Sequence, residues 1–261
     1  LLDKLSLYGI DSFWLSDYLD GHTQRVQVTC GAQGAVTQSA VRDNDVGVYQ
    51  GGSMSCILWN IFANDLCLHV PDSVRIIQFA DDTQLWTTGR KRDLPVLVDR
   101  MESALSNIFA WFCENHMKVN AAKTEFMTLG TRAMLRDLPD VTIRFCDNDI
   151  HATRQARSLG VIFDESLSFQ PHVDLIVRKC TGMLISLAHA RHVVPVRTIK
   201  HLIESLVFSP IRYCLSVYGI CSVTQVHRLQ KLINFGARVL TGRRKFDHVS
   251  DVIRDAGWLS V

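Results

Sequence analysis

The sequence predicts an α+β fold, in which an antiparallel sheet backed by helices is followed by an all-α region. Three observations support this prediction. Short runs that mix β-branched and aromatic residues, such as 74–79, recur in the first part of the chain and are typical of strands. Longer segments, most clearly 94–115, repeat apolar residues at helical spacing. Beyond Pro171 the pattern is helical, so we place a boundary there and expect two domains, 1–170 and 171–261.

The composition is that of an ordinary folded protein. The 261 residues are 47% hydrophobic and 21% charged, which excludes a disordered chain and allows one large domain or two small ones. The net charge of +2 conceals an asymmetry, because residues 1–170 hold 15 Lys and Arg against 21 Asp and Glu, whereas residues 171–261 hold 13 against 5. This distribution suits a metal-bearing body followed by a polyanion-binding part, and it also suits two parts with unrelated surfaces.

Helices and strands alternate in the first part of the chain. In order, we expect helices at 2–10 and 12–20, strands at 24–30 and 46–48, a Gln-Gly loop at 50–53 and a helix at 54–66. Ser53 precedes the last of these helices and is a suitable N-cap, because its hydroxyl can accept a hydrogen bond from a backbone N–H of the first turn. The next expected element is a β-hairpin made by strands 74–79 and 83–88.

A long amphipathic helix, which Asp93 can cap, follows the hairpin, and further strands come after it. The remaining expected elements are strands at 126–129, 141–145 and 158–164, then helices at 172–190, 196–208, 223–241 and 247–255. We expect the strands between residues 23 and 170 to form one antiparallel sheet, backed by the helices at 54–66 and 94–115.

The tip of the hairpin, Phe79-Ala80-Asp81-Asp82, is the stretch with the clearest chemistry. Adjacent carboxylates repel each other and are costly to desolvate, so a site that keeps them usually supplies a divalent cation, for which carboxylate oxygens are natural ligands. An isolated Asp-Asp pair is more often a solvated acidic turn. The motifs around this pair favour the metal site.

Three further motifs accompany the hairpin in a fixed order. Gln50-Gly51 leads into an apolar helix before it, and Asn120-Ala121-Ala122-Lys123-Thr124 and Leu159-Gly160-Val161 follow it. This order resembles the reverse transcriptases of non-LTR retrotransposons, in particular the jockey-like lineage, and the resemblance covers essentially the whole chain. It implies an enzyme, an RNA-directed DNA polymerase, with a partial polymerase palm followed by a helical, thumb-like region.

The resemblance implies a nucleotidyl transfer site that uses two Mg²⁺ ions. Asp81 and Asp82 match the metal-binding carboxylates of the family. Lys123 matches a lysine that protonates or neutralises the leaving pyrophosphate, a role that suits the point charge of an ammonium group. The alternative for Lys123 is a surface lysine in a turn.

Other motif residues match substrate contacts in the family. Gln50, Gly51 and Phe79 match positions on the incoming nucleotide and template, where a glycine lets the backbone approach its ligand. Leu159-Gly160-Val161 matches the hairpin that supports the primer end. The implied partners are an RNA template, a DNA primer and deoxynucleoside triphosphates, whereas the oligomeric state is left open.

The C-terminal part carries cations at helical spacing. Arg228 and Lys231 lie three residues apart and share a helix face, Arg238 lies about three turns further on, and Arg243-Arg244-Lys245 follow. A row of cations suits the phosphates of a template–primer duplex, bound without sequence preference. The alternative is a solubilising surface, since Lys and Arg favour helix exteriors.

Several features indicate an intracellular protein, placed in the cytoplasm and nucleus for an element of this family and not secreted. The eight cysteines form no Cys-x-x-Cys pair and mostly lie in apolar stretches, as buried free thiols of a reducing compartment do. Asp3 and Lys4 interrupt the start, so no signal peptide is visible. Polar residues break the uncharged run 46–64, so we expect no membrane span.

The match to the family also has a gap. The family's first catalytic aspartate lies in a strand just before the segment that matches Leu1–Ile10, and the fingers are missing as well. We therefore expect the chain as given to be inactive, because two adjacent carboxylates cannot supply the near-octahedral order that Mg²⁺ demands. Two other interpretations are a non-catalytic nucleic-acid-binding remnant and an unselected relic of a mobile element.

Overall fold

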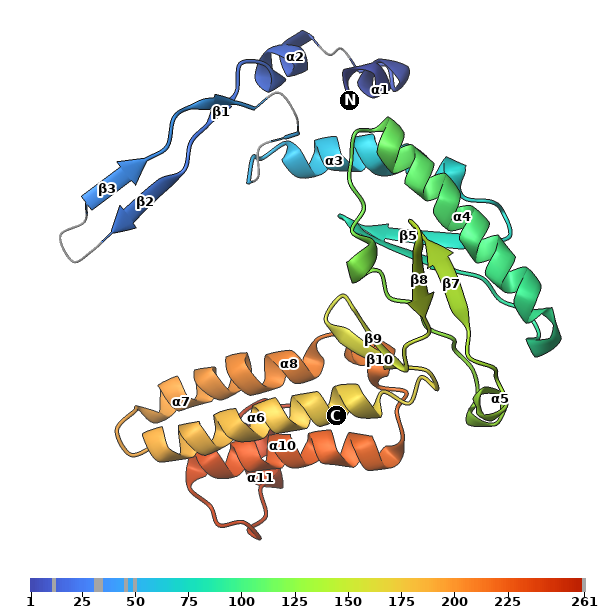
Figure 1. The fold of residues 1–261 in the computed structure, drawn as a ribbon. Helices are drawn as coiled ribbons and strands as arrows, with labels where there is room; N and C mark the ends of the chain where they lie inside the picture. Colours follow the sequence, from blue (N-terminus) through green and yellow to red (C-terminus); the bar gives the residue numbers. More distant parts are fainter. Residues whose placement is uncertain (11–12, 31–34, 45–46, 49–50, 260–261) are drawn as a thin grey trace. The chain divides into compact units, whose positions relative to one another are not determined.

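The computed structural model describes residues 1–10, 13–30, 35–44, 47–48 and 51–259. The chain forms two compact units (Figure 1). The first comprises Leu1–Ala121 and Arg144–Asn148, and the second comprises Ala122–Ile143 and Asp149–Val261. The boundary expected at Pro171 falls inside the second unit.

The first unit combines small sheets with two longer helices that flank a hairpin. Its helices are α1 (Leu2–Leu7), α2 (Phe13–Leu19), α3 (Ser55–Ala63), the 3-10 helices Asn64–His69 and Lys91–Asp93, and α4 (Leu94–Glu114). Its strands pair antiparallel as β1 (Thr23–Gln24) with β4 (Arg42–Asp43), β2 (Gln27–Cys30) with β3 (Ala35–Gln38), and β5 (Arg75–Phe79) with β6 (Asp82–Trp86). The segment from α3 to α4 carries the acidic hairpin.

A partly buried ion pair joins the helices of the first unit. Lys4 of α1 donates from Nζ to Asp65 Oδ1 and to the Phe62 carbonyl oxygen, both at 2.8 Å, and Nζ lies 4.5 Å from the Phe62 ring centroid. Trp111 of α4, which is 1% exposed, donates its indole N–H to the same Asp65 oxygen at 3.1 Å. The buried indole therefore has an acceptor for its N–H, as a tryptophan inside a core requires.

The second unit is a helical bundle preceded by two hairpins. In order, its elements are α5 (Arg132–Arg136), β7 (Thr142–Phe145), β8 (Asn148–His151), β9 (Gln155–Ser158), β10 (Val161–Asp164), α6 (Gln170–Ala190), α7 (Val196–Ile203), a π-helical turn Glu204–Phe208, α8 (Ser209–Arg212), α9 (Leu215–Tyr218), α10 (Val223–Thr241) and α11 (Ser250–Asp255). The β7–β8 hairpin contributes residues to both units, and the 3-10 turn Ala121–Lys123 spans the point where they divide.

The bundle core lies between α6, α7 and α10, which run side by side in Figure 1. Leu184, Ile203 and Leu229 come from these three helices and are fully buried. Tyr218 is also fully buried, and it donates its hydroxyl to the Ile211 carbonyl oxygen. The all-α region that the sequence predicts after Pro171 is therefore present, and its core also includes Val161 and Phe169, which precede it.

The β-structure differs from the sequence prediction of one continuous sheet. The strands of the described ranges form five separate two-stranded sheets. Within 158–164, Leu159 and Gly160 have φ angles of 45° and 85° and form a turn, so this stretch is a turn and one strand. Phe126 makes an isolated bridge with Ala152 instead of a strand. Residues 47–48 are also outside any strand. Local hairpins satisfy the backbone groups of these short runs.

Of the two expected helix caps, one differs in position and the other makes no side-chain hydrogen bond. The N-cap of α3 is Met54 rather than Ser53, and it makes no side-chain capping hydrogen bond. Asp93 does occupy the N-cap of α4, but its carboxylate makes no capping bond either. Packing of the apolar stripes of these helices therefore contributes more to their stability than capping does.

The cysteines are free, as expected, but most are not buried. Cys180 is buried in the bundle, whereas Cys30, Cys56, Cys67 and Cys113 are exposed. The sequence interpretation was wrong for these four because an apolar stretch still turns one face to solvent when it folds. Along the part of the chain with described positions, no helix has the length and hydropathy needed to cross a membrane.

A buried histidine makes the stability of the second unit depend on pH. His172 at the start of α6 accepts the Ile162 N–H on Nδ1 at 3.3 Å and packs edge-on against Tyr218. Burial, and to a lesser extent the charge of Arg157, lower the pKa of His172 below its usual value of about 6.5. The unfolded chain therefore binds a proton more readily than the folded chain does, and stability falls as pH drops below about 6.5.

We expect the loss of stability that His172 causes at low pH to be absent from His172→Phe. The measurement is urea unfolding followed by circular dichroism at about pH 7.5 and about pH 5.5, on either side of the usual histidine pKa. The native chain should lose more stability between these pH values than the variant does. Equal losses in the two proteins would contradict the assignment of the titration to His172.

Candidate active site

The acidic pair lies at the tip of the β5–β6 hairpin, as the sequence predicts. Phe79 pairs with Asp82, which leaves Ala80 and Asp81 as a two-residue turn. Ala80 has a φ of 53°, a left-handed conformation that costs a residue with a Cβ about 1–2 kcal/mol. Phe79 and both aspartates are exposed, and neither carboxylate has a hydrogen-bond or ion-pair partner among the residues whose positions are described.

Helix α3 holds the turn through its indole side chain. Trp59 donates Nε1–H to the Ala80 carbonyl oxygen at 2.8 Å, directly beside Asp81. A second contact comes from Gln78 of β5, which donates its side-chain amide to the Ala63 carbonyl oxygen of α3 at 3.5 Å. No sequence pattern points to Trp59, because only packing brings its N–H to a carbonyl 21 residues away.

The hairpin fits a divalent cation in the kind of donor that it offers. Asp81 and Asp82 present hard carboxylate oxygens, which are the ligands that Mg²⁺ prefers. Within the described ranges, no group of three or more His, Cys, Asp or Glu side chains is placed to hold a metal ion. The two carboxylates therefore fit one part of a metal site, which water, substrate or other residues would have to complete.

The other predicted substrate and catalytic residues are only partly described. Gly51 lies in the turn before α3 with a φ of 87°, which glycine adopts without strain. Gln50 lies outside the described residues. Lys123 ends the 3-10 turn Ala121–Lys123 and is exposed. It belongs to the second unit, so its place beside the acidic hairpin stays a prediction.

The Leu159-Gly160 turn of the β9–β10 hairpin is held by a tyrosine from the bundle. Ser158 pairs with Val161 across the turn. Tyr213, which follows α8, donates its hydroxyl to the Leu159 carbonyl oxygen at 2.7 Å. Gly160 has a φ of 85°, which favours glycine, and a Cβ there would lie 3.2 Å from the Tyr213 ring, a tight contact.

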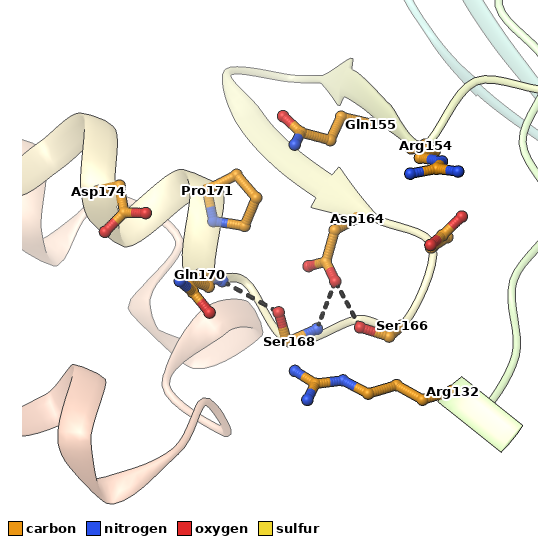
Figure 2. Close-up of a pocket in the computed structure, with 10 residues that line it drawn as sticks. Arg132, Arg154, Gln155, Asp164, Ser166, Ser168, Gln170, Pro171 and Asp174 are labelled. Atoms are coloured by element: carbon orange, nitrogen blue, oxygen red, sulfur yellow. Dashed lines mark hydrogen bonds between the residues drawn. The ribbon is translucent and has the colours of Figure 1, made fainter. Parts of the chain in front are cut away.

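A cavity of about 380 Å³ lies beside the end of β10 (Figure 2). Its lining comprises Arg132, Arg154, Gln155, Asp164, Glu165, Ser166, Ser168, Gln170, Pro171 and Asp174. Figure 2 shows Arg132 extending from α5 toward the loop that contains Ser166 and Ser168. The lining holds three carboxylates and two guanidinium groups, so its charge does not select an anionic ligand.

Comparison of the sequence with known protein families shows which family the chain belongs to. Residues 1–163 match the family model for reverse transcriptase (RNA-dependent DNA polymerase), and this match covers more than half of the chain. The chain belongs to the reverse transcriptase family. No solved structure matches it.

Relatives of this reverse transcriptase chain come from insect mobile elements. It is 22% identical over 84% of its length to the RNA-directed DNA polymerase from mobile element jockey of Drosophila melanogaster, and 26% identical over 82% to the jockey polymerase of Drosophila funebris. It is also 25% identical over 75% to a probable RNA-directed DNA polymerase from transposon BS. The chain spans about a quarter of the length of the jockey polymerases, 24% in each case.

The basic residues predicted in the C-terminal part of the reverse transcriptase chain fall into two groups. Arg228 donates to Asp174 and to Gln225, Arg238 donates to the Asp247 carbonyl oxygen, and Arg243 pairs with Asp251. By contrast, the side chains of Lys231, Arg244 and Lys245 are exposed and make no ion pair or hydrogen bond with the described residues. The second group has charge available for a partner.

Replacing Trp59 with phenylalanine tests how the turn is held in this reverse transcriptase chain. The variant keeps a ring but loses the N–H that binds the Ala80 carbonyl oxygen. Because a hydrogen bond contributes about 1 kcal/mol, we expect Mn²⁺ affinity at the hairpin to fall about fivefold, as measured by electron paramagnetic resonance titration. Trp86→Phe, at the far end of the same hairpin, is the matched control. Equal effects of the two replacements would contradict the role of Trp59.

Proposed function

We propose that the chain is part of an RNA-directed DNA polymerase of a non-LTR retrotransposon and supplies its metal-binding hairpin. The observation that carries this proposal is the pair of exposed carboxylates, Asp81 and Asp82, at a hairpin tip in a chain of the reverse transcriptase family, with no partner for either among the described residues. The names of the jockey and transposon BS relatives support the same activity. The reaction is the Mg²⁺-dependent transfer of a nucleotide to a primer 3′-hydroxyl.

The residues of the chain take distinct roles in this reaction. Asp81 and Asp82 would hold Mg²⁺, which in a two-metal site activates the attacking hydroxyl and stabilises the leaving pyrophosphate. Lys123 protonates that pyrophosphate or neutralises its negative charge. Phe79 lies one residue before the turn, where its exposed ring is available to the template or the incoming nucleotide, together with Gln50 and Gly51.

We assign residues 1–170 to a partial palm and residues 171–261 to a thumb-like region. The buried core of α6, α7 and α10 supports a helical body, and the excess of 13 Lys and Arg over 5 Asp and Glu supports contact with nucleic acid. The partners are an RNA template, a DNA primer and deoxynucleoside triphosphates. These partners place the reaction in the cytoplasm and nucleus.

Binding of a template–primer hybrid tests the proposal without requiring activity. The chain should bind an RNA–DNA hybrid without sequence preference, through Lys231, Arg244, Lys245 and neighbouring cations. If three or four phosphates are contacted, log Kd should change with log salt with a slope of about 3 in magnitude, at about 0.9 per contact. Binding that does not respond to salt would contradict the proposed surface, and absence of hybrid binding would favour a relic.

A second experiment tests the catalytic part. When the chain is preceded by the upstream segment of a jockey polymerase, it should extend oligo(dT) on poly(rA) with deoxythymidine triphosphate and Mg²⁺. Hybrid binding without any extension would favour the non-catalytic remnant. That interpretation is consistent with the lack of a three-ligand cluster among the residues with described positions.

A further inference from the structure

Cations from two separate elements meet at the C-terminal end of α10. Helix α10 ends at Thr241 and is capped by Gly242, which has a φ of 74° and donates its N–H to the Arg238 carbonyl oxygen at 2.7 Å. The guanidinium of Arg191, from the end of α6, packs directly against Gly242, where a Cβ would overlap it. Arg191 is 51 residues from Gly242 in the sequence, so only the fold adds its charge to the basic run that follows α10.

The loop after Gly242 is tied down by its own hydrogen bonds. Arg243 donates to both carboxylate oxygens of Asp251, at 2.6 and 2.5 Å, and to the His248 carbonyl oxygen at 2.6 Å. The Arg244 N–H binds Asp247 Oδ2 at 2.7 Å, and Arg238 binds the Asp247 carbonyl oxygen at 3.1 Å. Arg243 and Asp251 neutralise each other, so the role of Arg243 is to fix the loop.

The loop presents two cations and an aromatic ring to solvent. Phe246 is 87% exposed, and Lys245 Nζ lies 5.5 Å from its ring centroid. Arg244 and Lys245 are exposed, and no ion pair involves their side chains within the described part of the chain. Figure 1 shows this loop between α10 and α11, at the end of the bundle. An exposed ring flanked by cations can stack on a base while the cations bind its phosphates.

We propose that the loop Gly242–His248 binds single-stranded nucleic acid, with an unpaired base stacked on Phe246 and phosphates on Arg191, Arg244 and Lys245. The strand must be single because the bases of a duplex are already stacked on each other and offer no face to the ring. Such a strand is the part of a template that is not yet paired. This inference rests on the proposed function for the identity of that strand, but the contact itself requires only nucleic acid.

The test compares Phe246→Ser with the native chain in fluorescence anisotropy. The probes are a labelled oligo(rU) of about 20 nucleotides, the same backbone with abasic positions, and an RNA–DNA hybrid of equal length. Because stacking on an aromatic side chain commonly changes affinity about tenfold or more, Phe246→Ser should weaken oligo(rU) binding by about that factor. It should leave binding of the abasic strand and the hybrid unchanged. Phe246→Trp should retain the affinity and show quenched fluorescence on oligo(rU).

Phe13→Ser is the matched control, because Phe13 is 83% exposed but lies in the acidic part of the chain. Equal oligo(rU) affinity of Phe246→Ser and the native chain would overturn the inference while leaving the proposed function standing. If the native chain bound none of the three probes, the proposed function would fail as well. Loss of binding to phosphatidylserine vesicles in Phe246→Ser, with oligo(rU) binding unchanged, would assign the loop to a membrane surface and also overturn the inference.

Discussion

Replacing Asp81 with alanine is expected to reduce Mg²⁺-dependent primer extension about a thousandfold, in a polymerase that combines this chain with the upstream segment of a jockey relative. Asp81 lies in the two-residue turn of the β5–β6 hairpin, and its carboxylate is exposed. A metal ion stabilises transition-state charge by several kcal/mol, and each 1.4 kcal/mol or so is a factor of ten in rate. Extension of oligo(dT) on poly(rA) measures the loss.

The control for this prediction is Asp72→Ala, which removes an exposed carboxylate just before β5 on the same hairpin. It should extend the primer at the native rate. A Mn²⁺ titration of the chain as given supplies a readout that needs no activity, and there Asp81→Ala should weaken binding while Asp72→Ala does not. Native-rate extension by Asp81→Ala would show that the hairpin is not the metal site.

Replacing Asp164 with alanine is expected to destabilise the second unit by about 3 kcal/mol. Asp164 is 7% exposed at the end of β10, and it accepts the Phe169 N–H at 2.7 Å. It also accepts the Ser168 N–H at 3.1 Å and the Ser166 hydroxyl at 2.7 Å (Figure 2). Each bond to a charged acceptor contributes about 1.5–3 kcal/mol, and the variant leaves backbone donors without partners. The loop that Asp164 holds contains Leu167 and Phe169 at positive φ, a strained backbone conformation that these hydrogen bonds maintain.

The effect of Asp164 should depend on pH in a defined direction. Burial alone would raise the pKa of this carboxyl, but the hydrogen bonds from Ser166, Ser168 and Phe169 outweigh burial and lower it. The Asp164 carboxylate therefore contributes fully to stability above the usual pKa of about 3.9, and this contribution is lost as pH falls below that value. Urea unfolding at neutral pH and near pH 3 measures the free energy of unfolding of the native chain and of Asp164→Ala. The difference between the two free energies should be smaller at the lower pH.

Glu165→Ala is the matched control, since it removes the neighbouring carboxylate but leaves Asp164 and its three hydrogen bonds in place. It should change stability by less than about 0.5 kcal/mol, as is usual for a substitution away from a hydrogen-bond network. A loss in Glu165→Ala as large as that in Asp164→Ala would mean that charge in this loop, rather than the bonds to Asp164, stabilises it.

The sequence by itself determined the features that depend on short-range order. The acidic hairpin follows from two strand-like runs around Asp81 and Asp82, because neighbouring strands joined by two residues pair directly. The helices α4, α6 and α10 follow from apolar residues at helical spacing, and the family follows from the order of four motifs. The hairpin and the helices require only residues that are close in the chain, and the family requires only the order of the motifs along it.

Only the tertiary structure decided which distant groups meet. No periodicity connects the pairs that matter here. They are the Trp59 N–H with the Ala80 carbonyl oxygen, the Tyr213 hydroxyl with the turn at Gly160, and Arg191 with Gly242. The structure also divided the cations of the C-terminal part, because carboxylates brought close by folding neutralise Arg228 and Arg243, whereas no described carboxylate pairs with Lys245. A charge is available to a partner only if the fold leaves it without a near carboxylate, and that depends on geometry that a linear sequence does not contain.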